Sequence, residues 1–157
     1  MAHDTLKINR PNVRMVAHRG CSGLEKENTN AAFVAAGNRS YYGVETDVHL
    51  TADGQFIIIH DDDTFRVSGD KLSVEGSTFE TLRKVRLKDV DGERGRTDLC
   101  LPSLPEYIRI CKKYDKICVL ELKNHMEPAA IAGIVEVIRT LDWLDNMVFI
   151  SFDHANM

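Results

Sequence analysis

The amino-acid sequence predicts an α/β fold with a largely parallel sheet. Short apolar segments typical of strands alternate with segments of helical periodicity, and this alternation is typical of a parallel sheet covered by helices. The chain has 157 residues, 43% hydrophobic and 28% charged, as expected for one globular domain or part of one. Strands are expected at residues 14–18, 43–50, 56–59, 116–122 and 148–152, in the order β-α-β-β-α-α-β-α-β.

The first helix and the hairpin follow from local signals. Thr29 precedes an apolar segment and is a favoured residue for capping a helix, which is expected to end at Gly37. The strand at 43–50 alternates in polarity, and Asp53-Gly54 then predicts a two-residue turn into the next strand. A charged, polar loop is expected after that strand.

Capping boxes place the middle helices. Ser77 with Glu80, and Ser103 with Glu106, have the spacing at which a side chain and a backbone N–H are bonded reciprocally at a helix start. Helices are therefore expected from about residue 78 and from about residue 104. The last helix follows Pro128, with its apolar residues on one face.

Composition excludes several classes of partner. The 24 acidic and 20 basic residues are interleaved and give a net charge of −4, with no basic block for nucleic acid. No apolar run approaches the roughly 20 residues of a membrane span. The start, Met1–Asp4, has no apolar secretion segment, so a cytoplasmic location is expected. The four cysteines form no C-x-x-C pair and are expected to be reduced thiols.

Three carboxylates are expected to converge on the sheet. Glu45 and Asp47 lie two apart on one strand and share a face, and Glu121 shares a face with Lys123 on a later strand. Carboxylates about 4 Å apart repel by roughly 4 kcal/mol at an effective dielectric near 20, which a bound divalent cation would relieve. An all-oxygen set favours Mg²⁺, Ca²⁺ or Mn²⁺, which the sequence does not rank. The alternative is a strand whose acidic face meets solvent.

Two histidines follow apolar strands. The two-residue turn would set Asp47 directly opposite His60, bringing carboxylate and imidazole together. His18 occupies the equivalent place after the first strand. Two imidazoles near a metal can act as general acid and general base. His49 shares the parity of Asp47 but lies further toward the turn, and is the weaker candidate.

Two cations point to an anionic substrate. The planar guanidinium of Arg19 matches phosphate oxygens, and Lys123 would add a point charge. A single arginine or lysine is more often a salt-bridge partner, so the prediction that these two bind phosphate depends on their adjacency to the histidines and carboxylates. Glu27-Asn28 could line the same opening.

The polar residues fall into short motifs along the chain: His18-Arg19-Gly20, Glu27-Asn28-Thr29, Glu45-x-Asp47-Val48, Thr51-x-Asp53-Gly54, His60-Asp61, Arg66 and Glu121-x-Lys123. Together these motifs resemble the glycerophosphodiester phosphodiesterase family, over residues 14 to about 153. The resemblance implies a TIM-type (β/α)₈ barrel, and members that use a divalent cation to hydrolyse a glycerophosphodiester substrate to glycerol 3-phosphate and an alcohol.

Roles carry over by position. The resemblance implies an acid/base pair, three metal ligands and two phosphate-binding cations. These are, respectively, His18 and His60; Glu45, Asp47 and Glu121; and Arg19 and Lys123. In the family a substrate glycerol hydroxyl can attack phosphorus first, giving a cyclic phosphate that water later opens. The sequence departs from the family at Lys26, where the family usually has proline.

Length is the larger departure from the family pattern. A complete (β/α)₈ barrel takes about 250 residues, and only five strands are expected here. Residues 1–157 are therefore expected to be the N-terminal part of a single barrel domain with unpaired edges, prone to association. Its oligomeric state is not predicted. Two alternatives remain: a related lipid phosphodiesterase of the phospholipase D or C kind, or an inactive fragment that binds phosphate or a partner.

Overall fold

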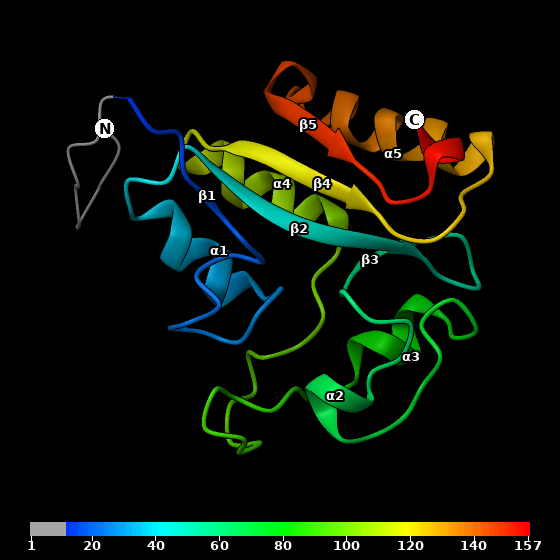
Figure 1. Cartoon of the computed structure of the whole chain (residues 1–157). Helices are drawn as coiled ribbons and strands as arrows, with labels where there is room; N and C mark the ends of the chain where they lie inside the picture. Colours follow the sequence, from blue (N-terminus) through cyan, green and yellow to red (C-terminus); the bar gives the residue numbers. More distant parts are fainter. Residues whose placement is uncertain (1–11) are drawn as a thin grey trace.

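The computed structural model describes residues 12–157, which form a five-stranded sheet flanked by helices (Figure 1). The expectation drawn from Met1–Asp4 concerns residues outside this range. The strands are β1 (Val16–Ala17), β2 (Gly43–Leu50), β3 (Phe56–Ile58), β4 (Ile117–Leu122) and β5 (Met147–Ile150). The helices are α1 (Asn30–Gly37), α2 (Phe65–Ser68), α3 (Phe79–Arg83), α4 (Leu104–Lys113) and α5 (Pro128–Thr140), with 3₁₀ turns η1 (Leu144–Asn146) and η2 (His154–Asn156).

The sheet confirms the α/β prediction. Strands β1, β2, β4 and β5 are neighbours in that order and all run parallel. Strand β3 leaves this path and pairs antiparallel with β2. The fold is an incomplete TIM-type barrel in which four of the five strands occupy barrel positions. Because β3 is a hairpin branch, four further parallel strands, rather than about three, would close the barrel.

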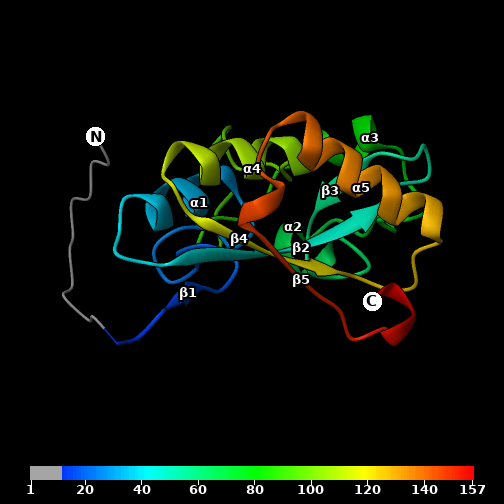
Figure 2. The same cartoon turned by 90° about the horizontal axis from the view of Figure 1, so that it is seen from above.

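Helices cover one face of the sheet. Figure 2 shows α1, α4 and α5 on the same side. Phe33 on α1 meets Tyr107 on α4 edge to face, with ring centroids 5.1 Å apart, and the Tyr107 hydroxyl donates to the Val44 carbonyl at 2.7 Å. This packing joins both helices to β2, so close-packed side chains support the strand that carries Glu45 and Asp47.

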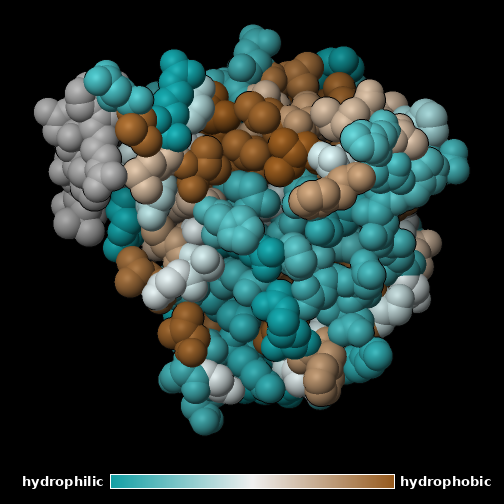
Figure 3. Space-filling model, viewed as in Figure 1, coloured by the Kyte–Doolittle hydropathy of each residue, from teal (hydrophilic) through white to brown (hydrophobic). Residues whose placement is uncertain are grey.

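The opposite face is apolar near the sheet edges. Val16 on β1, and Val148 and Ile150 on β5, are each more than a third exposed. Figure 3 shows hydrophobic residues gathered across the upper part of the face viewed in Figure 1, with hydrophilic residues below. Within residues 12–157, no helix combines the length and apolar character needed to cross a membrane.

A second, smaller core lies beneath the hairpin. Ile57 and Ile59 pack with Val67 of α2, Leu82 of α3 and the loop residue Leu101, all at most 3% exposed. The polar loop expected after β3 thus contains a short helix, α2, which the sequence did not reveal because four residues are too few to show a period.

Helix caps agree with the sequence at two places and differ at a third. Thr29 accepts from the Ala32 N–H, and Ser103 with Glu106 forms a complete capping box. The predicted cap at Ser77 is wrong: Thr78 is extended and its hydroxyl accepts from Thr81 N–H. Glu80, expected to complete the box, instead accepts from Lys84 at 2.7 Å.

The hairpin register also differs from the prediction. Val48 pairs with Ile58 and Leu50 with Phe56, so the turn holds one residue more than expected. Thr51 stabilises this wider turn, because its side chain accepts from Gln55 N–H at 3.0 Å. Asp47 therefore lies opposite Ile59, whose N–H donates to the Asp47 carbonyl at 3.2 Å, and His60 lies one position further on.

The four cysteines are free thiols, as expected. Strand β1 is shorter than the predicted 14–18 segment, since parallel pairing with β2 holds Val16 and Ala17 alone.

Candidate active site

Three carboxylates meet on one face of the sheet. Asp47 on β2 and Glu121 on β4 are paired in the parallel register, and Glu45 lies two residues before Asp47 on the same face. One oxygen from each lies within 4.8 Å of the others. The three residues are 7%, 0% and 7% exposed in the order Glu45, Asp47, Glu121, so the cluster predicted from the sequence is both assembled and buried.

The cluster is electrostatically unfavourable by itself. Burial, followed by the charge of Asp47, raises the pKa of Glu45 to about 7, although a bond from the Arg19 N–H at 2.8 Å opposes the shift. Oδ1 of Asp47 is buried and has no hydrogen-bond partner among residues 12–157. An unpartnered buried oxygen in an all-oxygen cluster fits a hard divalent cation.

The segment between β1 and α1 folds over these carboxylates. Arg19 and Asn28 both adopt the left-handed backbone region, with φ of 54° and 53°. This turns the Arg19 N–H toward Glu45, while Nδ2 of Asn28 donates to Asp47 Oδ2 at 2.8 Å. Oδ1 of Asn28 accepts from Thr46 Oγ1 at 2.8 Å. The sequence placed Asn28 only near the opening, because nothing local shows that its amide reaches β2.

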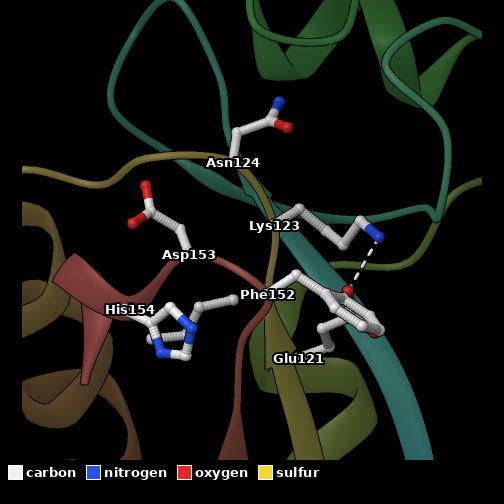
Figure 4. A pocket seen from close by; sticks show the side chains of 7 residues that line it. Glu121, Lys123, Asn124, Phe152, Asp153 and His154 are labelled. Atoms are coloured by element: carbon white, nitrogen blue, oxygen red, sulfur yellow. Dashed lines mark hydrogen bonds and ion pairs between the residues drawn. The ribbon is translucent and has the colours of Figure 1, made fainter.

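Two cations flank the carboxylates. Nε of Arg19 lies 3.7 Å from Asp47 Oδ2, and Nζ of Lys123 lies 2.8 Å from Glu121 Oε1 and 3.9 Å from Asp47 Oδ1. The Lys123–Glu121 bond is drawn in Figure 4. Nε of Arg19 is buried and makes no hydrogen bond within the described part of the chain. The site therefore keeps donor capacity for an anion.

The two histidines have different surroundings. Nε2 of His18 lies 3.9 Å from Glu45 Oε2, and its side chain is 70% exposed. Nδ1 of His60 lies 2.7 Å from Oδ1 of Asp61. His49, the weaker candidate, is fully buried, and its Nδ1 lies 3.2 Å from Glu75. Within the described residues, its ring makes no hydrogen bond to the three carboxylates.

A pocket opens beside two of these residues. Glu121, Lys123, Phe152, Asp153 and His154 are among the residues that line a cavity of about 480 Å³ (Figure 4). Phe152 is 89% exposed, so an aromatic ring stands at the edge of the cavity. The pocket places open space next to a buried carboxylate and a cation.

Arg66 and Asp61 are further site residues whose roles the sequence did not reveal. Asp61 contacts His60, and Arg66 bonds both Asp61 and Glu27. Glu27 and Arg66 lie 39 positions apart, and no local pattern links residues at that distance. In the sequence, Arg66 and Asp61 stood out only as parts of the family motifs.

Fold and site together define an α/β barrel protein with a buried carboxylate cluster flanked by an arginine and a lysine. The model of the glycerophosphoryl diester phosphodiesterase family matches residues 18–156. The chain therefore belongs to this family.

Individual relatives agree. A glycerophosphodiester phosphodiesterase of Caldanaerobacter subterraneus is 28% identical over 145 residues, which cover 91% of this chain and 59% of the relative. Mouse glycerophosphodiester phosphodiesterase 1 is 32% identical over 78% of this chain and 38% of its own length. An Oleispira antarctica phosphodiesterase, solved with the product sn-glycerol-3-phosphate, superposes with a TM-score of 0.80 at 28% identity, covering 92% of this chain and 59% of that one. The chain thus spans well under two thirds of the length of these relatives.

Proposed function

We propose that the protein containing this chain hydrolyses glycerophosphodiesters to glycerol 3-phosphate and an alcohol, with the aid of a divalent cation. The observation that carries the proposal is the buried group of three carboxylates, with oxygens within 4.8 Å, flanked by a lysine and an arginine. Repulsion among buried carboxylates needs a cation, and the flanking cations suit a phosphate diester. The substrate is a small molecule.

The metal ligands in this proposal are Glu45, Asp47 and Glu121. Their all-oxygen donors suit Mg²⁺, Ca²⁺ or Mn²⁺, and the unpartnered Asp47 Oδ1 supports that fit. When bound, such an ion polarises a phosphoryl oxygen as a Lewis acid.

Arg19 and Lys123 hold the phosphate in this proposal. Both side chains are mostly buried, at 18% and 15% exposure, so their charges are screened less than surface charges. Arg19 lies against Oδ2 of Asp47, and Lys123 lies against Oδ1 of Asp47 and against Glu121. A phosphate between them would be oriented from two directions.

His18 and His60 form the proposed acid/base pair. If Nδ1 of His60 donates to Asp61, its Nε2 is left with a lone pair that can take a proton. The exposed ring of His18 lies beside Glu45, where a proton can be exchanged with an attacking or leaving oxygen. In the proposed order of events, a glycerol hydroxyl attacks phosphorus and gives its proton to one histidine, while the P–O bond to the alcohol breaks and the alcohol leaves with a proton from the other. Water then attacks the resulting cyclic phosphate and opens the ring to glycerol 3-phosphate.

The pocket beside Lys123 is the proposed place for one arm of the diester. It adjoins the proposed phosphate site and offers both an aromatic ring and polar groups. The product complex of the Oleispira antarctica relative supports glycerol 3-phosphate as the common half of the substrate. A cytoplasmic location stays a prediction.

We also propose that residues 1–157 are the N-terminal part of one barrel domain. The chain covers 59% of the Caldanaerobacter subterraneus and Oleispira antarctica relatives and supplies four parallel strands. Four more βα units would pair with β1 and β5 and cover their exposed apolar residues.

The test measures release of glycerol 3-phosphate from glycerophosphocholine with Mg²⁺, Ca²⁺ or Mn²⁺. Activity should vanish on adding EDTA, and His18→Ala should lower the rate by about 10²- to 10⁴-fold, the usual cost of losing a proton-transfer group. Lys84→Ala is the control, because Lys84 is an exposed residue whose ion pair with Glu80 lies outside both the carboxylate cluster and the pocket. Activity indifferent to both EDTA and His18→Ala would refute the proposed mechanism.

A further inference from the structure

One guanidinium joins two loops of the site. Arg66, on α2, donates through Nε and Nη2 to both oxygens of Asp61, at 2.6 and 3.1 Å. Its Nη1 and Nη2 also donate to both oxygens of Glu27, each at 2.8 Å. The two carboxylates come from segments far apart in sequence, one after β1 and one after β3, so this set of four bonds closes a long-range connection.

Each of these two carboxylates also contacts a residue of the proposed site. Oε1 of Glu27 accepts from Nη1 of Arg19 at 3.0 Å, and Oδ1 of Asp61 lies 2.7 Å from Nδ1 of His60. The five side chains thus form an unbroken series, which we call the Arg66 bridge: Arg19, Glu27, Arg66, Asp61 and His60.

We propose that Arg66 is a positioning residue that fixes the phosphate-binding Arg19 and the proton-transferring His60 relative to each other. This inference rests on the proposed function, because it takes the roles of Arg19 and His60 from there. Arg66 itself bonds neither of them directly.

The charges of the bridge support this role. The bonds from Arg66 hold the pKa of Glu27 at about 2 against the effect of burial, with help from Arg19. Burial raises the pKa of Asp61, but the bonds from Arg66 and His60 outweigh it and hold the pKa at about 2. Both carboxylates therefore stay ionised, and an ionised Asp61 holds the His60 ring in one orientation.

Geometry makes arginine necessary here. A planar guanidinium can meet two carboxylates with paired bonds, whereas an ammonium offers only a point charge. Without the guanidinium, Glu27 and Asp61 would face each other as two negative charges, and both would rotate away. Arg19 and His60 would then lose the side chains that hold them.

A bridge on the surface of the same chain provides a control. Arg96 also joins two carboxylates, with bonds to Glu25 at 2.6 Å and to Asp98 at 2.7 Å, and one of them lies in the same β1–α1 segment. Within residues 12–157, Arg96 bonds Glu25, Asp89 and Asp98 and reaches no proposed catalytic or metal-binding residue. Arg96→Gln therefore loosens the same segment without breaking the series to His60.

The experiment compares Arg66→Gln, Arg66→Lys, Arg66→Ala and Arg96→Gln by kcat and KM for glycerophosphocholine. Arg66→Gln should lower kcat/KM by about 100-fold, as expected for a misplaced catalytic group, with a clear fall in kcat. Arg66→Lys should recover only part of the lost kcat/KM, and guanidinium ions added to Arg66→Ala should raise its activity several-fold. The kcat/KM of Arg96→Gln should stay within about twofold of that of the original protein. An Arg66→Gln variant as active as the original, or equal losses in Arg66→Gln and Arg96→Gln, would overturn the inference.

A second readout does not depend on activity. Carboxyl NMR titration should show the pKa of Asp61 rising by about 1 to 3 units in Arg66→Gln, and the His60 ring signals should change with it. Unchanged Asp61 and His60 signals would overturn the inference. If the unaltered protein released no glycerol 3-phosphate while these signals responded as expected, the proposed function would fail and the bridge would stand.

Discussion

At the scale of single residues, the site is built by polar groups that reach across to carboxylates. Asn28 bonds Asp47 and Thr46 with its two amide ends, and its backbone is in the left-handed region that asparagine tolerates better than most residues. The Arg19 backbone N–H bonds Glu45 in the same way. Each carboxylate is thus held in one orientation before any cation arrives, which lowers the cost of binding one.

The pKa of Glu45 leads to a prediction about pH. With a pKa of about 7 in the folded chain and 4.5 as the ordinary value, the folded form keeps a proton that the unfolded form has lost. Without metal, the contribution of Glu45 to stability is therefore greatest below about pH 4.5 and falls as pH rises toward 7, by roughly 1.4 kcal/mol per unit. Metal binding needs the ionised carboxylate, so metal should raise the melting temperature more at pH 8 than at pH 5.5.

Glu45→Gln checks this prediction by thermal unfolding with EDTA or with excess metal. The neutral amide should make the metal-free protein more stable than the original at pH 8 and should abolish most of the gain from metal. Glu136→Gln, an exposed change on α5, should leave both behaviours intact. A gain from metal that is independent of pH would show that Glu45 is not a ligand.

At the scale of elements, close packing between the β1–α1 segment and α1 places Arg19 over the sheet. Gly20 has a φ of 75°, and a Cβ there would lie 2.7 Å from the backbone carbon of Ala32. Cys21 N–H donates to the Ala32 carbonyl at 3.0 Å, which fixes the approach. Only glycine satisfies both the backbone angle and the space.

Gly20→Ala should therefore be costly. The left-handed backbone alone costs about 1 to 2 kcal/mol for a residue with a Cβ, and the clash adds to it. We expect a loss of at least about 2 kcal/mol in the free energy of unfolding by urea, together with weaker metal binding. Gly23→Ala, in the same segment with nothing within 4 Å of the added carbon, should change stability little. Similar effects from both substitutions would contradict the packing described here.

At the scale of the whole molecule, the four parallel strands of residues 12–157 leave one side of β1 and one side of β5 without a neighbouring strand. Val148 is 45% exposed on β5, and Val16 is 38% exposed on β1. Open edges with exposed apolar side chains favour pairing with another chain.

The isolated 157-residue chain should therefore associate as its concentration rises. Val148→Lys should reduce this association, because a charge on an edge strand opposes pairing. Val13→Lys, at a residue 59% exposed outside the strands, is the control and should have little effect. Sedimentation velocity over a range of concentrations measures the difference, and a monomer at every concentration would contradict the prediction.

Much of the fold and the carboxylate cluster could be predicted because the signals are local or periodic. Thr29 and the Ser103–Glu106 pair marked helix starts, since capping needs residues only three apart. Alternation along β2 placed Glu45 and Asp47 on one face, and Glu121 met them because parallel neighbours present the same face. The sequence by itself determined the five strands, helices α1, α3, α4 and α5, their order and the charge of the site.

Only the tertiary structure decided how these elements meet. One extra residue in the hairpin turn moved His60 away from the position opposite Asp47, and the cap of α3 shifted from Ser77 to Thr78. The Arg66 bridge joins two loops 39 positions apart, and no local pattern encodes that distance. Turn width and loop contacts depend on small free-energy differences among packed alternatives, which the three-dimensional arrangement of the chain resolves.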